Sequence, residues 1–264
     1  MRSFETIRFE QEGAVGIVTL DRADKMNPLN ALMFAELQEA FGAMRNDPSV
    51  KAVVLTGAGK AFCSGGDVGE LQTGSLAARS FMAARTASRD FAMDVKAFEK
   101  PVIGAVNGIA AGGGAALAMM CDVVYASERA AFSIIFRRVG MVPDCGSLYL
   151  LTQLVGPAKA KQLAMSGEIL GARDMLDLGI AQKVCEPANL MEEAKEFARE
   201  CAEGPALVLG LSKMLIDRAK TMSIEEFFDY ESLCLPLVME SEDFHEGVSA
   251  FVEKRPAVFG RSAL

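Results

Sequence analysis

The 264-residue chain lacks tryptophan and has one histidine, and its six cysteines form no CxxC pair. That histidine, His245, lies in the charged segment SEDFHEG, which is typical of a surface residue and argues against Ser-His-Asp catalysis. Without CxxC pairs or His-rich spacing, the cysteines are expected to be reduced, mostly buried thiols of a cytoplasmic protein. The sequence therefore predicts no metal site.

The chain also lacks an excess of positive charge and a long apolar run. Its 27 Lys+Arg face 35 Asp+Glu, a formal net charge of -8, which argues against a general nucleic-acid or anionic-membrane partner. The most apolar stretch, 110–124, is interrupted by three glycines and Asp122, so we expect no transmembrane helix. The N-terminal MRSFETIRFEQEG has no basic and apolar signal pattern, and we expect no secretory leader.

What is present is a regular alternation of strand and helix patterns. Apolar, β-branched runs at 52–56, 102–106 and 122–126 read as buried strands, with helical patterns between them. This order predicts an α/β body with right-handed crossovers and a largely parallel sheet. Strand signals thin out after about residue 145. We therefore expect a core over residues 1–190 and a helical C-terminal region over 191–264.

The C-terminal region is rich in large apolar side chains. Three helices can bury only part of them internally, so they either pack on the body or build a subunit interface. The residues in question are Met214, Leu215, Ile216, Phe227, Phe228, Leu233, Leu235, Leu237, Val238 and Met239. Both readings are open from the sequence.

Two glycine signals for nucleotide binding fail on inspection. The segment Gly57–Ala61 resembles part of a phosphate loop, but Val54 stands where its first glycine is required and Ala61 where Ser or Thr would bind magnesium. No GxGxxG opens a helix after a strand with an acidic residue about twenty positions on. The sequence thus gives no support for a P-loop or a dinucleotide fold.

Two other glycine clusters each follow a predicted strand. They are FCSGGD at 62–67 and AAGGG at 110–114, the second directly before a helix. A backbone without Cβ lets a ligand oxygen approach an N–H, and a helix N-terminus adds a positive dipole end. One N–H from each loop could form an oxyanion hole that polarises a carbonyl. The alternative is two ordinary tight turns.

Six segments carry a resemblance to a known family: DRADKMNPLNALM, KAFCSGGD, PVIGAVNGIAAGGG, CDVVYA, VGMVPDCG and FVEKRPAVFG. Through them the chain resembles the enoyl-CoA hydratase/isomerase, or crotonase, family over nearly its whole length, which favours the oxyanion hole over ordinary turns. The resemblance implies a crotonase-like spiral of repeated β-β-α units with a helical C-terminal region, assembled as trimers or pairs of trimers. It also implies an acyl-CoA thioester ligand whose oxygen is held by the N–H groups of Gly66 and Gly113, with no cofactor beyond the coenzyme A of the substrate.

The departures from the family pattern bear on the reaction. Hydratases of the family carry one Glu after the glycine cluster (GGGCE) and a second in FGQPE, where this chain has Ala116 and Phe136. Neither side chain transfers a proton, so family-type hydration is in doubt. Asp144 stands where isomerases of the family have an Asp, and GMVPDCG is most similar to the phenylacetate-pathway isomerases. The alternative is that Asp144 caps a helix starting at Ser147.

One carboxylate suits a double-bond shift. It can remove a proton next to a thioester and return it to a carbon two bonds away, while the oxyanion hole stabilises the enolate. The apolar neighbours of Asp144 are expected to raise the pKa of its carboxyl, and Phe136 and Ala116 to keep water out. The sequence leaves open which acyl group is used, and whether in fatty-acid or phenylacetate degradation.

The resemblance also places residues around the coenzyme A portion. In the early loop these are Arg22, Lys25 and Met26, and in the C-terminal segment Lys254 and Phe259. The substrate-binding set is completed by Ser64, Gly65, Asp67, Gly112 and Phe136. Each Lys or Arg could equally be a solvated surface residue, and Asp67 is expected to brace its loop.

Two further functions remain open. One is a hydratase whose carboxylates come from elsewhere, such as Glu70 or Asp67. The other is a catalytically silent homologue that binds coenzyme A or RNA, although the net charge of -8 counts against RNA.

Overall fold

The computed structural model describes residues 4–67, 69 and 75–260. Its main feature is a six-stranded sheet in the order β1-β2-β3-β5-β7-β10, in which every pair except the β1–β2 hairpin is parallel. The hairpin turns at Gly13, which has a φ of 59°. The strands are β1 Ile7–Glu12, β2 Val15–Leu20, β3 Ala52–Gly57, β5 Val102–Val106, β7 Val123–Ser127 and β10 Lys183–Cys185.

A second sheet of short strands lies at the carboxyl ends of the first. Its order is β4-β6-β8-β9, with β4 Ala61–Cys63, β6 Ile109–Ala111, β8 Ala131–Ser133 and β9 Leu170–Gly171. Successive turns of the chain add one strand to each sheet and then a helix, as β3-β4-α3, β5-β6-α4 and β7-β8-α5. The chain is therefore a spiral of β-β-α units, as expected.

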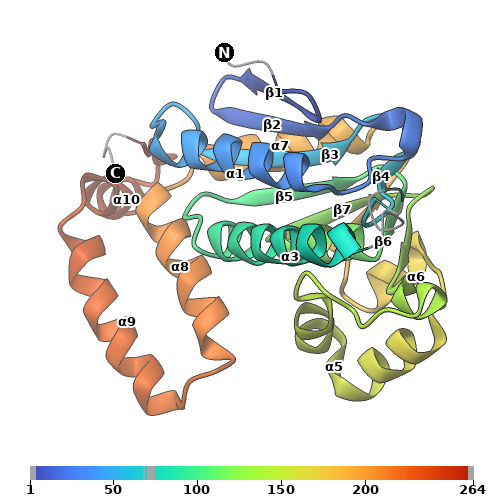
Figure 1. Cartoon of the computed structure of the whole chain (residues 1–264). Helices are drawn as coiled ribbons and strands as arrows, with labels where there is room; N and C mark the ends of the chain where they lie inside the picture. The colour runs from blue at the N-terminus through green and yellow to red at the C-terminus, as the bar shows by residue number, and fades with distance from the viewer. Residues whose placement is uncertain (1–3, 68, 70–74, 261–264) are drawn as a thin grey trace.

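The helices of the body include α1 and α3 on one face of the main sheet and α7 on the other (Figure 1). They are α1 Ala31–Asn46, α3 Ser75–Lys96, α4 Gly113–Met120, α5 Ser147–Ser166, α6 Ala172–Asp177 and α7 Leu190–Ala202, with short 3-10 turns η1 Ala23–Lys25 and η2 Ile135–Val139. Helix α1 begins after Asn30, whose side chain accepts a hydrogen bond of 2.9 Å from the Met33 N–H and so caps the helix.

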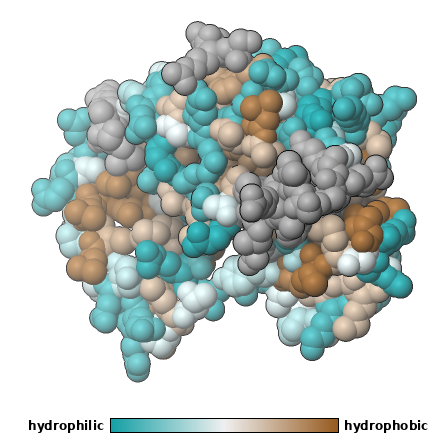
Figure 2. Space-filling view, in the orientation of Figure 1, coloured by the Kyte–Doolittle hydropathy of each residue, from teal (hydrophilic) through white to brown (hydrophobic). Residues whose placement is uncertain are grey.

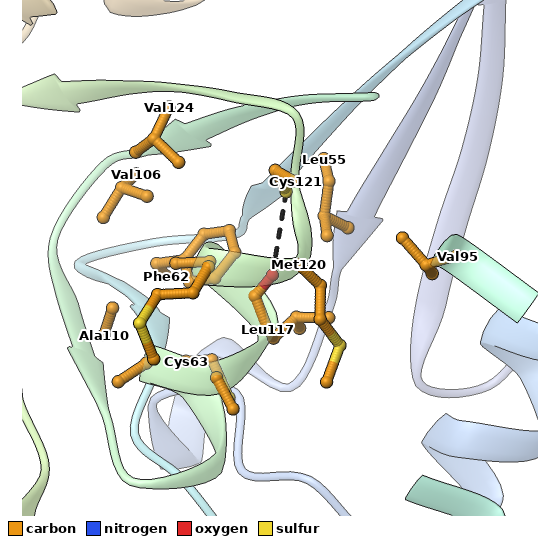
Figure 3. Packing of buried hydrophobic residues seen from close by; sticks show 14 of the residues in the cluster. Leu55, Phe62, Cys63, Val95, Val106, Ala110, Leu117, Met120, Cys121 and Val124 are labelled. Atoms are coloured by element: carbon orange, nitrogen blue, oxygen red, sulfur yellow. Dashed lines mark hydrogen bonds between the residues drawn. The ribbon is translucent and has the colours of Figure 1, made fainter. Parts of the chain in front are cut away.

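Helix α4 lies in the middle of the core. All eight of its residues are buried, and Phe62, Leu55 and Val95 approach it from β4, β3 and α3 (Figure 3). At its C-terminal end, the Cys121 thiol lies 3.7 Å from the Leu117 carbonyl oxygen. A helix enclosed on all sides gives little freedom to its first residue, Gly113, so this candidate site residue has a rigid support.

The C-terminal region leaves the body later than residue 190. Ala194 and Ala198 of α7 are fully buried, in a cluster of apolar residues that includes Val15 and Val54 of the main sheet. The part that projects from the body starts with α8 Ala206–Ala219 and continues with α9 Ile224–Met239 and α10 Glu242–Glu253 (Figure 1). We call α8, α9 and α10 the C-terminal arm.

The arm leaves many apolar side chains in solvent. Figure 2 shows apolar side chains gathered over the arm and, on the other side of the molecule, over the α5–α6 side. Packing on the body does not account for the arm's large apolar residues, because six of the ten remain exposed: Ile216, Phe228, Leu233, Leu235, Leu237 and Met239.

Several smaller expectations can be compared with the same structure. All six cysteines are free, and His245 is exposed on α10. Among the helices of the described residues, none combines the length and the apolar character needed to cross a bilayer.

Candidate active site

Two loops at the carboxyl ends of β4 and β6 meet in the structure. The strands are parallel neighbours, with Ala61 opposite Ile109 and Cys63 opposite Ala110. A Cβ added to Gly65, whose φ is 105°, would lie 2.9 Å from the Ala111 carbonyl oxygen and 3.7 Å from the Gly113 nitrogen. Only glycine permits this approach, so the FCSGGD and AAGGG clusters are parts of one site.

The Gly66 N–H is directed away from the segment that contains Leu29. Leu29 and Gly66 form an isolated parallel bridge, in which Leu29 N–H donates to the Gly65 oxygen at 2.7 Å and Asp67 N–H donates to the Leu29 oxygen at 2.9 Å. The pairing uses the groups on either side of Gly66. Its own N–H therefore points to the other side of the loop.

Gly113 supplies a second donor of the same kind. It is the first residue of α4, where an N–H has no partner within the helix and carries the positive end of the helix dipole. The preceding Gly112 has a φ of 55° and donates to the Ser133 oxygen at 2.9 Å, which fixes the turn into the helix. Two backbone donors of this type suit a carbonyl oxygen that becomes negative.

Asp67 is held by Arg22 rather than left available for proton transfer. The Arg22 guanidinium donates to the Asp67 carboxylate at 2.7 Å and to the Pro28 oxygen at 2.8 Å. Burial acts to raise the pKa of Asp67, but the hydrogen bond and charge of Arg22, with smaller contributions from the Gly69 N–H and Lys25, lower it below its ordinary value. Asp67 therefore braces the loop.

The early loop lies along the glycine loop. Ser64 N–H donates to the Met26 oxygen at 3.0 Å, and Met26 and Lys25 are both exposed at the outer edge. Asn27, which sequence reasoning missed, holds the early loop against β4 and the turn before it. Its buried side-chain amide donates to the oxygens of Ala58 and Ala61 at 2.9 and 2.8 Å. The positive φ of Asn27, 53°, is a conformation in which Asn is enriched.

Asp144 is not a helix cap. Helix α5 has Gly146 as its N-cap and no side-chain cap hydrogen bond. The Asp144 carboxyl is half-buried, and this desolvation raises its pKa, while a hydrogen bond with the Cys145 side chain lowers it in part. The Cys145 sulfur would lie 3.5 Å from a Cβ added to Gly113. Asp144 is therefore hydrogen-bonded to a thiol whose sulfur lies next to Gly113.

The two positions that carry glutamates in the family's hydratases are apolar and buried here. Ala116 is fully buried in the first turn of α4. Phe136, on η2, is 6% exposed, and its ring would lie 3.7 Å from a Cβ added to Gly112. Phe136 therefore borders the glycine loop and offers it no proton donor or acceptor.

Lys254 and Phe259 are not brought to this site within one chain. Phe259 lies against Gly247 of α10, and together with α8 and α9 it lines an apolar hollow of about 290 Å³. The next residue, Gly260, approaches the side chain of Lys51, which precedes β3, whereas the glycine loops lie beyond the other end of β3. A six-residue strand separates these ends by about 20 Å.

Glu70, the other carboxylate that a hydratase could use, lies outside the described residues. No group of three or more His, Cys, Asp or Glu that could hold a metal ion occurs in the described part of the chain.

Comparisons with known proteins identify the family. The model of the enoyl-CoA hydratase/isomerase family matches residues 10–262, and the chain belongs to this family. It is 36% identical to the 1,2-epoxyphenylacetyl-CoA isomerase of Escherichia coli K12, covering 97% of this chain and 98% of that protein. It is also 36% identical to the short-chain-enoyl-CoA hydratase of Clostridium acetobutylicum, covering 93% and 94%.

Solved structures of the family share the fold. The enoyl-CoA hydratase of Bacillus anthracis superposes with a TM-score of 0.92 at 28% identity, covering 98% of this chain and all of that one. The crotonase fold expected from the sequence is therefore confirmed, and the protein is an enzyme of the hydratase/isomerase family. Its relatives include both isomerases and hydratases.

Proposed function

We propose that the protein is an acyl-CoA isomerase that shifts a carbon–carbon double bond of a CoA thioester, with Asp144 as the proton carrier. The observation that carries the proposal is the combination of three residues around Gly112 and Gly113. Ala116 and Phe136 replace the two hydratase glutamates, while the half-buried Asp144 adjoins Cys145, whose sulfur borders Gly113.

In the proposed mechanism, Asp144 in its ionised form removes a proton from C2 of a 3-enoyl-CoA. The electron pair of the C–H bond passes into the thioester, whose oxygen becomes negative and accepts hydrogen bonds from the Gly66 and Gly113 N–H groups. Protonated Asp144 then returns the proton to C4, and the double bond lies between C2 and C3. One carboxylate is regenerated, and no water is consumed.

The substrate is proposed to be either a 3-enoyl-CoA or a ring-epoxide of phenylacetyl-CoA. The Escherichia coli relative is named for the epoxide, which makes it the first aromatic substrate to assay. The coenzyme A portion is proposed to lie near Lys25 and Met26 at the exposed edge of the early loop, with Ser64, Gly65 and Gly112 shaping the thioester position.

The test is an assay of the purified protein on a 3-enoyl-CoA, on the ring-epoxide and on a 2-enoyl-CoA. We expect a rearranged product from one of the first two and no 3-hydroxyacyl-CoA from the third. A 3-hydroxyacyl product would favour the second candidate, a hydratase, which the Clostridium acetobutylicum relative supports. Binding of CoA esters without any product would indicate a catalytically silent homologue.

A further inference from the structure

We propose that Cys145 is a positioning residue: its thiol donates to the Asp144 carboxylate, accepts a hydrogen bond from Ser88, and so fixes the orientation of the carboxylate. The inference rests on the role proposed above for Asp144. Cys145 itself takes no part in the proposed proton-transfer steps.

The position of the thiol is fixed from three sides. Ser88 of α3, only 3% exposed, makes a side-chain hydrogen bond with Cys145. The Cys145 sulfur lies against Gly113, where an added Cβ would be 3.5 Å away, and close enough to the buried Cys63 to interact with it electrostatically. Helices α3 and α4 and the loop before α5 therefore converge on one sulfur atom.

The backbone at Cys145 is itself unusual. Its φ is 53°, in the left-handed region that residues with a Cβ seldom adopt, and it is followed by Gly146 with a φ of 70°. Two consecutive residues of this conformation turn the chain sharply just after Asp144. Strain of this kind persists only where surrounding contacts fix it, and here the hydrogen bonds of the thiol supply such contacts.

The direction of the hydrogen bonds follows from the number of protons. An ionised carboxylate only accepts, so the single thiol proton has to be donated to Asp144. The sulfur then has lone pairs alone to offer to Ser88, whose hydroxyl donates to it. The order Ser88 to Cys145 to Asp144 stabilises the ionised base and opposes the effect of burial on its pKa.

Other ionisable groups near Asp144 do not take over this role. Among the described residues, the titratable groups that face the Asp144–Cys145 pair are the thiols of Cys145 and Cys63. Burial and the neighbouring carboxylate raise the pKa of the Cys145 thiol far above neutrality, so it stays protonated and able to donate. The nearby Arg137 and Arg138 on η2 donate to carbonyls at the end of α5.

The experiment compares pH profiles of kcat/KM for the wild type, Cys145→Ala, Cys145→Ser and Ser88→Ala, with Cys201→Ala on α7 as a matched control. Without the thiol donor, the acidic limb of Cys145→Ala should move upward by about one pH unit, since a hydrogen bond to a charged group has about that effect. Cys145→Ser, which keeps a donor, should restore the limb. Ser88→Ala should move it in the same direction by less, and Cys201→Ala should leave it unchanged.

A lower kcat in Cys145→Ala with an unmoved acidic limb would overturn the proposal and leave the thiol a packing residue. If Cys145→Ala does not fold, the displacement in Ser88→Ala decides in the same way. If the wild type has no isomerase activity, the proposed function fails separately. The inference is then tested by infrared titration of the Asp144 carboxyl, assigned by its loss in Asp144→Asn, which should shift to higher pH in Cys145→Ala; an unshifted titration would overturn it.

Discussion

At the residue scale, two helical glycines differ sharply in the space around them. A Cβ on Gly114 of α4 would lie 2.2 Å from the Cys63 oxygen, whereas a Cβ on Gly42 of α1 would have nothing within 4 Å. Gly114 therefore marks the close approach of α4 to β4, and Gly42 marks no contact at all.

This contrast predicts opposite effects of the same substitution on stability. Gly114→Ala forces backbone apart and should lower the free energy of unfolding by about 3 kcal/mol. Gly42→Ala restricts the unfolded chain and should raise it by about 0.5–1 kcal/mol. Urea denaturation followed by circular dichroism measures both. Equal effects of the two substitutions would contradict the packing described for α4.

The carboxyl of Asp144 links function to stability in a second residue-scale prediction. Burial raises its pKa, so the folded state binds a proton more tightly than the unfolded state. The stability that this provides is present below the ordinary carboxyl pKa and is lost as pH rises through the raised value. At pH 7 the buried charge then costs stability.

Asp144→Asn should therefore be more stable than the wild type at pH 7, by a few degrees in melting temperature, and the difference should shrink toward pH 4. Thermal melts across this range measure it. Asp177→Asn, which changes an exposed carboxyl on α6, is the control for the substitution itself. A less stable Asp144→Asn at pH 7 would show that the carboxylate makes a stabilising contact.

At the scale of elements, the sequence predicts those helices and strands whose residue patterns are long enough to recognise. Helix α1 has an Asn cap and apolar residues at steps of three and four, and β3 and β5 are apolar runs of five or six residues. The strands β4, β6 and β8 have three residues each, and β9 has two, too few for any period to show. They form by pairing, which only the folded chain provides.

The residues of the candidate site also differ in whether the sequence predicts them. The glycine clusters and Asp144 were predicted from local motifs and from a family resemblance. Cys145 and Ser88 were not, since a single cysteine and a helical serine have no distinctive pattern. Their meeting depends on α3 crossing the loop before α5.

A partly buried ion pair attaches the arm to the body, with side chains that are 11% and 21% exposed. Lys213 of α8 donates to Asp122 at 2.7 Å, and Asp122 also accepts from the Val102 N–H at 2.8 Å. Burial raises the pKa of Asp122, and Lys213 opposes this. On the same helix, the pair Lys96–Asp217 is more open, with each side chain about a third exposed.

Removing each lysine should therefore have different effects. Lys213→Met leaves a partly buried carboxylate without its hydrogen-bonded partner and should cost about 1–2 kcal/mol of unfolding free energy. Lys96→Met should cost less than about 1 kcal/mol, as for other partly solvated pairs. The two variants are compared by chemical denaturation at neutral pH. Equal losses would contradict the assignment of Asp122–Lys213 as the anchor of the arm.

At the scale of the whole molecule, the arm exposes several large apolar side chains on neighbouring helices. Phe228 and Leu235 on α9 are 57% and 56% exposed, and Phe251 on α10 is 86% exposed. We propose that these side chains are covered by further copies of the chain, in a trimer or a pair of trimers.

Light scattering after size exclusion should then give three or six times the 28.2 kDa of one chain. The double substitution Phe228→Glu and Leu235→Glu should shift the mass to a single chain, because the charges would be buried on assembly. Glu225→Gln and Glu231→Gln, on the same helix, form the matched control and should leave the mass unchanged. A monomeric wild type would contradict the proposal.

The central claim is that Asp144 moves the proton in the double-bond shift. The most direct measurement is turnover of the identified substrate by Asp144→Asn, with binding of the same CoA ester measured by calorimetry. We expect binding close to that of the wild type and a fall in kcat of about 1,000-fold or more, as for the loss of an acid–base group. Turnover equal to that of the wild type would contradict the claim, and the proton carrier would have to be another residue.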